Sequence, residues 1–182
     1  MGRRSGADVT KRDMMDTVVM IRFMPRFLQD GELRLRPVRF WDGLFLSKIR
    51  SRTILQDGQK LPAFGSWLSE WWWLKKTFSF SYQIELGMEC IGFVGICDLI
   101  PGETGEMALV IFDERHRRFG YGSRVFHIVA QAMKKYRVAD RIVVRVEGRK
   151  SGSTAFWQRN GLREVADSGG IKVMSRNLSG MD

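Results

Sequence analysis

A short basic turn between an apolar stretch and a helical pattern is the part of this sequence best suited to bind an anion. The apolar run is 107–112, and the turn that follows contains RRFGYG at positions 117–122. A helix N-terminus leaves backbone N–H groups unpaired and carries about half a positive charge, and glycine lets a ligand approach the backbone closely. We therefore expect a phosphate or another anion to bind at this turn.

The spacing of the glycines excludes two common phosphate-binding motifs. A dinucleotide fingerprint needs a third glycine, and that position holds Val125. A P-loop needs lysine and then serine or threonine after its last glycine, and no such pair follows Gly122. Residues 115–150 hold eleven Arg or Lys against two acids, a local charge of +9 within a total of +10. This cluster fits a phosphorylated small ligand or a nucleic-acid backbone, and a solvated surface is the third interpretation.

The hydrophobic periodicity predicts an α/β domain built on a largely antiparallel sheet with helices on both faces. Alternating or continuous apolar runs predict strands, and spacings of three and four predict helices. The predicted strands are 32–39, 78–85, 90–100, 107–112, 141–147 and a closing hairpin of 162–166 and 171–176; the predicted helices are 41–52, 66–78, 123–136 and 153–160.

The chain divides into an N-terminal extension, residues 1–31, with a predicted short helix, and a single domain over 32–182. No run approaches the 18 apolar residues of a membrane helix, and charges stand where a signal peptide needs its apolar core. We therefore expect a cytoplasmic protein that does not bind a membrane. Cys90 and Cys97 lie seven apart in one predicted strand, so we expect two free thiols on opposite faces.

Three consecutive tryptophans, 71–73, mark the helix predicted at 66–78. They span about 200° at 3.6 residues per turn and cannot share one narrow face. Trp71 continues a core stripe, so Trp72 or Trp73 must lie elsewhere. Packing under loops, the wall of a substrate pocket and a subunit contact all remain open. We take Trp72, Trp73 and Tyr82 as candidate substrate-binding residues.

The frame Arg117-x-x-Gly120-x-Gly122 fits the Gln/Arg-x-x-Gly-x-Gly/Ala pattern of the GNAT superfamily of acyl-CoA-dependent N-acyltransferases. The chain resembles this family over about 32–176. LRLRP at 33–37 resembles the first strand of the family, and AFWQRNGL at 155–162 resembles its last helix and turn. The general pattern is most similar to enzymes that acetylate protein N-termini, including those of ribosomal proteins. The resemblance implies a GNAT-like mixed, mostly antiparallel sheet.

The resemblance also implies acetyl-CoA as co-substrate and a place for it to bind. The backbone of the strand before the motif would bind the pantetheine arm like an added strand, and successive amides of the turn would hold the pyrophosphate. Arginines of the motif would add charge near the phosphates. The cofactor-binding residues implied in this way are Val110, Ile111, Phe112, Arg117, Arg118, Phe119, Gly120, Tyr121, Gly122 and Ser123, with Arg124 adding charge.

The catalytic groups are harder to place. Direct acyl transfer needs a neutral amine, a donor for the oxyanion and a proton for the leaving thiolate. Family members often use a tyrosine of the last helix as the proton donor, and that position holds Trp157, whose indole is not a useful acid. Tyr82, a serine at 151 or 153, or water remains as the donor. Glu106 and Glu147 are the candidate bases, and each is also placed to form a structural ion pair with a nearby arginine.

We expect an N-acetyltransferase that acts on a primary amine, either a protein N-terminus or a small molecule. An α-amine with a pKa near 8 is about a tenth neutral at pH 7, whereas a lysine near 10.4 is neutral about once in a few thousand. A site without an obvious acid–base pair therefore suits the α-amine better. The alternative is an RNA- or ribosome-associated protein of the same fold that binds through the 115–150 cluster and is either inactive or acetylates an RNA-linked amine. We expect no metal, because no ligand partner is spaced for His116, and a homodimer is left open.

Overall fold

The computed structural model describes residues 24–42, 67–147 and 151–181. Helices occur in the described ranges at α3 (Trp67–Thr77), α4 (Tyr121–Lys135) and α5 (Ser151–Arg159), with a short 3-10 turn at Glu114–His116. None of these helices has the length and apolar character needed to cross a membrane. The strands are β1 (Leu28–Asp30), β2 (Leu33–Pro37), β3 (Phe78–Leu86), β4 (Glu89–Ile100), β5 (Thr104–Ile111), β6 (Arg141–Glu147), β7 (Arg163–Ser168) and β8 (Ile171–Asn177).

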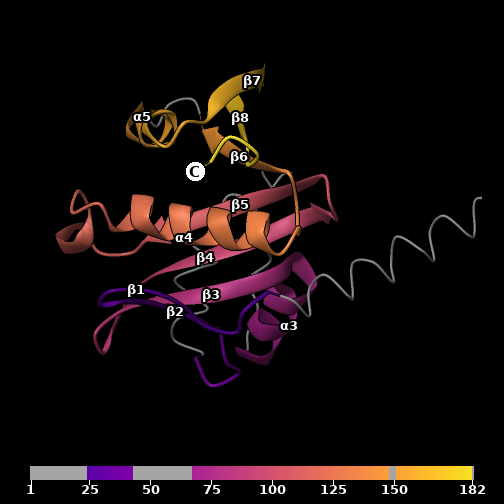
Figure 1. Cartoon of the computed structure of the whole chain (residues 1–182). Coiled ribbons are helices and arrows are strands. Elements are labelled where there is room, and N and C mark those ends of the chain that lie inside the picture. The colour runs from indigo at the N-terminus through magenta and orange to yellow at the C-terminus, as the bar shows by residue number, and fades with distance from the viewer. Residues whose placement is uncertain (1–23, 43–66, 148–150, 182) are drawn as a thin grey trace, which may run out of the picture.

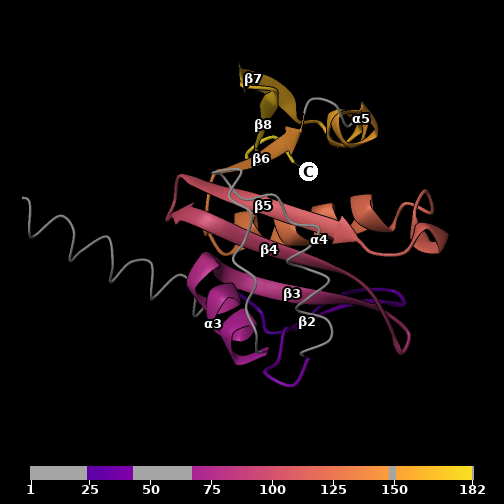
Figure 2. The same cartoon turned by 180° about the vertical axis from the view of Figure 1, so that it is seen from behind.

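The strands form one sheet with helices on both faces (Figures 1 and 2). Their order is β1-β2-β3-β4-β5-β6-β8-β7, and every neighbouring pair is antiparallel except β5 and β6. The predicted α/β fold on a mostly antiparallel sheet is therefore confirmed. The crossover between the two parallel strands is α4, as parallel strands require a long connection.

The strand and helix predictions agree with the structure in the described part of residues 32–176, and β1 was not predicted. The turn between β3 and β4, the whole of β6 and the closing hairpin lie where the pattern places them. The helix expected at 41–52 lies outside the described residues from 43 onward, as does the extension up to residue 23. The described end of that extension includes β1, which pairs with β2 and so joins the sheet.

The sheet separates two apolar clusters. The larger lies between the sheet and helices α4 and α5, where Val125, Phe126 and Val129 of α4 are buried. The smaller lies under α3 and contains buried Leu74 and Phe78. Trp71 and Trp73 pack against this smaller cluster and Trp72 is 72% exposed, as the helical angle between the three requires.

A bulge in β4 overturns the prediction for the two cysteines. Glu85 pairs with Cys90 and Ile84 pairs with Gly92, so Ile91 is an extra residue in β4. The side-chain alternation shifts by one at this point, and Cys90 and Cys97 both pack in the cluster under α3. The prediction of opposite faces is wrong because the bulge breaks the period of two. Among the described residues neither cysteine forms a disulfide.

Candidate active site

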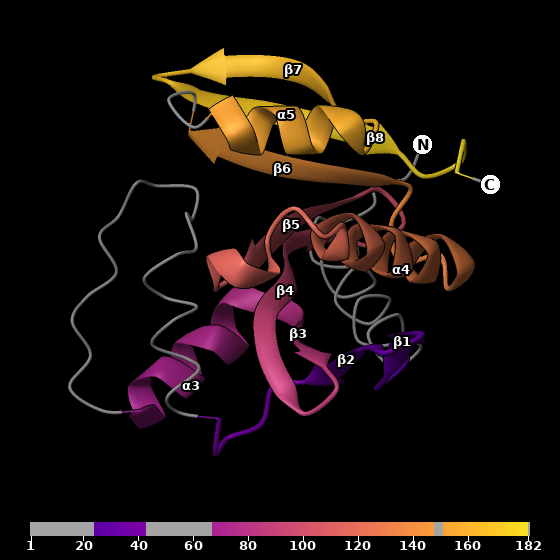
Figure 3. The same cartoon turned by 90° about the vertical axis from the view of Figure 1, so that its left-hand side faces the viewer.

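Strands β5 and β6 are paired only where they begin. Residues 104–106 pair with 141–143, and among the described residues no strand pairs with β5 on that side beyond Glu106. Figure 3 shows β6 lying apart from β5 over the rest of its length. We call the ends of the two strands that do not pair with each other, 107–111 and 144–147, the splay. The sheet therefore leaves backbone groups of β5 without a strand partner at this point.

The backbone groups that face the splay follow from one hydrogen bond. Phe112 N–H donates to the Ile91 carbonyl on β4 at 2.9 Å. Because successive residues of a strand direct their backbone groups to opposite sides, Val110 also faces β4, and Leu109 and Ile111 face the splay. Of the three residues predicted to bind pantetheine, only Ile111 is therefore placed to do so. Leu109 was not among the predicted residues, because the side-chain pattern does not fix which backbone groups a neighbouring strand will use.

The turn before α4 is built to leave helix amides open. Gly120 is the N-cap residue, with φ of 83° in the left-handed region, and it provides no side-chain cap. The first intrahelical bond is from Arg124 N–H to the Gly120 carbonyl at 3.0 Å, so the amides of the first turn, 121–123, have no helical acceptor. Arg118 also has a positive φ, 67°, which is unusual for a side-chain-bearing residue and is typical of functional turns. This geometry suits a phosphate group.

The three arginines predicted to supply charge have different partners. Arg117 donates to the carbonyls of the β5 end, and Arg124 pairs with Asp30 on β1 at 2.7 Å. The side-chain hydrogen bond from Arg124 lowers the pKa of Asp30. Within the described residues Arg118 makes no hydrogen bond or ion pair of its own, so its guanidinium is available for a phosphate. Phe119 and Tyr121 of the same turn stack loosely, with ring centroids 6.2 Å apart.

Gly122 is required by packing between helices. A Cβ atom at this position would lie 3.1 and 3.3 Å from two ring atoms of Phe156 on α5, and 3.7 Å from Leu109. Beside this contact, Asn160 donates to the Ser123 hydroxyl at 3.1 Å. Helix α5 is thus held closely against the first turn of α4. Close approach of a helix is a second reason for glycine at this position, beside the close approach of a ligand expected from the sequence, which stays a prediction.

Trp157 and Tyr82 do not reach the splay as proton donors. Trp157 is 6% exposed and packs edge-on against Phe126 and Phe156, so it is a core residue between α4 and α5. Tyr82 lies on β3, two strands away from β5, and donates its hydroxyl to the Pro25 carbonyl at 2.7 Å. Burial raises the pKa of Tyr82 to about 12. This placement gives no support to Tyr82 as a substrate-binding residue.

Glu106 stands where the two strands part, on the face of the sheet covered by α3. Its buried carboxylate forms an ion pair with Arg145 of β6, across the point where strand pairing ends. Arg145 also lies 4.0 Å from Asp98. Glu147 is two residues beyond Arg145, hence on the same face of β6, and is half-buried. The structure therefore brings both predicted carboxylates to the splay. Glu106 also forms an ion pair with an arginine, which is the structural role that the sequence left open for it.

The ligand atoms of Cys97, Asp98 and Glu106 lie within 4.8 Å of one another, a spacing that a metal ion could bridge. The guanidinium of Arg145 contacts both carboxylates and supplies positive charge there. Burial, and next the charge of Asp98, raise the pKa of the Cys97 thiol to about 12. The donor set fits an ion-pair cluster better than a metal site.

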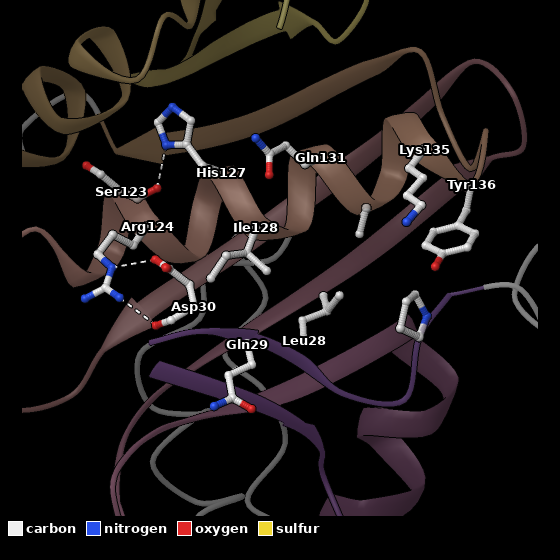
Figure 4. Close-up of a pocket in the computed structure, with 12 residues that line it drawn as sticks. Leu28, Gln29, Asp30, Ser123, Arg124, His127, Ile128, Gln131, Lys135 and Tyr136 are labelled. Atoms are coloured by element: carbon white, nitrogen blue, oxygen red, sulfur yellow. Dashed lines mark hydrogen bonds and ion pairs between the residues drawn. The ribbon is translucent and has the colours of Figure 1, made fainter. Parts of the chain in front are cut away.

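A groove of about 600 Å³ lies elsewhere, between α4 and the segment 25–30 (Figure 4). The ion pair of Arg124 with Asp30 spans it near Ser123, and Lys135 and Tyr136 line its other end. In Figure 1, β1 lies along one side of α4 and α5 along the other, so this groove is separate from the splay. None of the predicted catalytic residues lines it.

The basic residues of the described part of the cluster, 115–147, lie on several elements. Arg115 pairs with Asp113, and this hydrogen bond lowers the pKa of Asp113 to about 2. Arg141 donates to Asn177 on β8, and Lys134 donates to the Met181 carbonyl near the C-terminus. These positions are distributed over the turn, the end of α4 and β6. Trp72 and Trp73 lie on α3, and their part in substrate binding stays a prediction.

Comparison with known proteins identifies the fold. Residues 49–162 match the acetyltransferase (GNAT) family, and a search of curated proteins gave no match. Among solved structures, a dodecameric spermidine N-acetyltransferase from Vibrio cholerae is 15% identical, with a TM-score of 0.64 over 82% of this chain and 96% of that chain. RimJ from Mycobacterium smegmatis, solved with CoA-disulfide, is 18% identical, with a TM-score of 0.65 over 82% of this chain and 83% of that chain. A probable GNAT-family acetyltransferase from Chromobacterium violaceum is 15% identical, with a TM-score of 0.65 over 85% and 87%.

Proposed function

Because this chain belongs to the GNAT family of acetyltransferases, we propose that it moves an acetyl group from acetyl-CoA directly to a primary amine. The observation that carries the proposal is the splay of β5 and β6 beside the uncapped start of α4. A thioester arm needs backbone partners, and a pyrophosphate needs amide donors and positive charge. Both requirements are met within one short stretch of chain, 109–123.

The proposed cofactor position assigns a task to each part of this stretch. Leu109 and Ile111 present backbone groups to the pantetheine amides. The amides of residues 121–123 and the guanidinium of Arg118 bind the pyrophosphate. The thioester then lies toward the point where the strands part, close to Glu106.

The proposed reaction forms a C–N bond and breaks a C–S bond. The neutral amine attacks the thioester carbonyl, the tetrahedral intermediate collapses, and CoA leaves as thiolate or thiol. The amine proton goes to a carboxylate at the splay or to water. We assign Glu106 as the acceptor of this proton, directly or through one water, with Glu147 as the second candidate.

The acceptor amine approaches from the face of the sheet that α3 covers. Asp98, Glu106 and Glu147 bring three carboxylates to this face, beside the guanidinium of Arg145. Carboxylates attract an ammonium group before it loses its proton. This supports a protein N-terminus or a small cationic amine as acceptor, and the similar Vibrio cholerae structure is named for an amine of the second class, spermidine.

Isothermal titration with acetyl-CoA tests the proposed donor. The parent protein should bind acetyl-CoA, and Arg118→Ala should weaken binding by about tenfold, the loss of one charge-assisted hydrogen bond. Arg124→Ala is the matched control, because the Arg124 side chain is committed to Asp30, and it should change affinity less than threefold. Absence of binding at high micromolar protein would refute the proposal.

A panel of amines then tests the acceptor. Thiol release from acetyl-CoA is followed with spermidine, with a peptide bearing a free α-amine, and with an α-acetylated peptide whose only amine is a lysine. We expect turnover with one of the first two and little with the third. Glu106→Gln should lower kcat by at least tenfold with that acceptor while acetyl-CoA affinity is retained. Equal turnover of parent and Glu106→Gln would remove the role assigned to Glu106.

A further inference from the structure

The side chain of Arg117 folds back onto the end of β5. Its Nε and Nη2 atoms each donate to the Ile111 carbonyl at 3.2 Å, and Nη2 also lies 3.4 Å from the Phe112 carbonyl. Nη1 lies 3.5 Å from a Glu114 carboxylate oxygen, which is a weak contact at an exposed site. The guanidinium therefore links the turn that follows β5 to the last residue of the strand.

The Ile111 carbonyl is one of the backbone groups that face the splay. Its direction follows from the neighbouring Phe112 N–H, which is used by Ile91 on β4. A carbonyl at an open strand end, without a partner strand, is free to tilt. Two hydrogen bonds from one planar guanidinium restrict that tilt, because both donors converge on one oxygen in a fixed geometry.

We propose that Arg117 is a positioning residue that fixes the end of β5 relative to the phosphate-binding turn, and that it is not a phosphate ligand. The inference rests on the proposed function, because it concerns how acetyl-CoA is held. It also accounts for the Gln/Arg alternative at the first position of the motif, since both side chains donate hydrogen bonds to a carbonyl but only one is charged. A role as phosphate ligand would instead favour the charged side chain.

The two roles are distinguished by acetylpantetheine, which has the thioester arm of acetyl-CoA without its phosphates. If Arg117 positions the strand end, Arg117→Ala lowers the affinity for acetyl-CoA and for acetylpantetheine by a similar factor. The factor should be on the order of tenfold, for the hydrogen bonds lost. Arg118→Ala, the matched control, lowers the affinity for acetyl-CoA and leaves the affinity for acetylpantetheine unchanged. Arg117→Gln should bind both donors within about threefold of the parent. NMR titration is suitable because acetylpantetheine binds weakly.

Two results of the binding titrations would overturn the proposal. One is a loss on Arg117→Ala confined to acetyl-CoA; the other is equal damage by Arg117→Gln and Arg117→Ala. Amide hydrogen exchange in the ligand-free protein provides a readout that does not depend on donor binding. Exchange at residues 112–119 should be faster in Arg117→Ala than in the parent, Arg117→Gln or Arg118→Ala, and unchanged exchange would refute the positioning role. A parent that binds neither donor but shows this exchange pattern would refute the proposed function alone.

Discussion

The contact between Gly122 and Phe156 gives a prediction whose size can be worked from the structure. A Cβ atom at Gly122 would meet ring atoms of Phe156 at 3.1 and 3.3 Å, a few tenths of an ångström too close. Overpacking of this kind costs about 1–3 kcal/mol. Alanine in place of glycine in a helix contributes up to about 1 kcal/mol in the other direction. We expect Gly122→Ala to lower the free energy of unfolding by about 1 kcal/mol, the difference between these effects.

The chain contains a matched control for this substitution. Gly152 is the second residue of α5, as Gly122 is the second residue of α4, and a Cβ at Gly152 would meet nothing within 4 Å. Gly152→Ala should therefore be neutral or stabilising by up to about 1 kcal/mol. In a Phe156→Ala background, Gly122→Ala should also be neutral or stabilising, because the ring that the new Cβ atom would contact is absent.

Urea denaturation of the four proteins of this cycle measures the coupling between the two positions. We expect an interaction free energy of about 1–2 kcal/mol between Gly122→Ala and Phe156→Ala. Acetyl-CoA affinity, measured on the same proteins, should fall with Gly122→Ala because α5 is displaced from the start of α4. Equal stabilisation by Gly122→Ala with and without Phe156 would refute the packing argument.

Two further predictions concern the framework around the site. Tyr82→Phe should lower the free energy of unfolding by about 1–2 kcal/mol without changing acetyl-CoA affinity, because it removes only the buried hydrogen bond to Pro25; a selective loss of acceptor turnover would return Tyr82 to the substrate site. Asp42→Asn should cost about 1–2 kcal/mol near pH 7, since Asp42 forms a partly buried ion pair with Arg36 at 2.8 Å and Arg36 keeps Glu85 as a second partner. Burial alone would raise the pKa of Asp42, but hydrogen bonds from Arg36 and the Arg39 amide outweigh it and lower the pKa. The stabilisation is therefore present above the ordinary carboxyl pKa near 4 and lost as the pH falls through the lower folded value, so denaturation of parent and variant should converge in acid; a constant difference down to pH 2 would contradict this assignment.

The elements could be predicted from the sequence because local patterns determine them. The alternation at 141–147, the glycines of the closing hairpin and the glycine-containing turn before α4 each specify their structure within a few residues. The side of the strand to which each residue's backbone groups point could not be predicted, because it depends on which neighbouring strand pairs with each group. The three residues predicted to contact pantetheine therefore included Val110 and Phe112, whose amides face β4, and left out Leu109, whose backbone groups face the splay. The bulge at Ile91 reversed the expected faces of the cysteines for the same reason.

The site could be predicted in part. The motif located the turn before α4, but it gave the same meaning to three arginines whose surroundings differ in space. It also gave a ligand-binding reason for Gly122, whose neighbour Phe156 is 34 residues away in the chain and belongs to another helix. Long-range partners of this kind are set by the packing of whole elements and leave no local pattern.

Amide hydrogen exchange along β5, with and without acetyl-CoA, tests the central claim most directly. In the free protein the amides of Leu109 and Ile111, which face the splay, should exchange quickly, while those of Val110 and Phe112, which face β4, should be protected. Acetyl-CoA should then slow exchange at Leu109 and Ile111 and in the first turn of α4. Binding of acetyl-CoA that leaves these amides unprotected, or that protects another surface, would contradict the account.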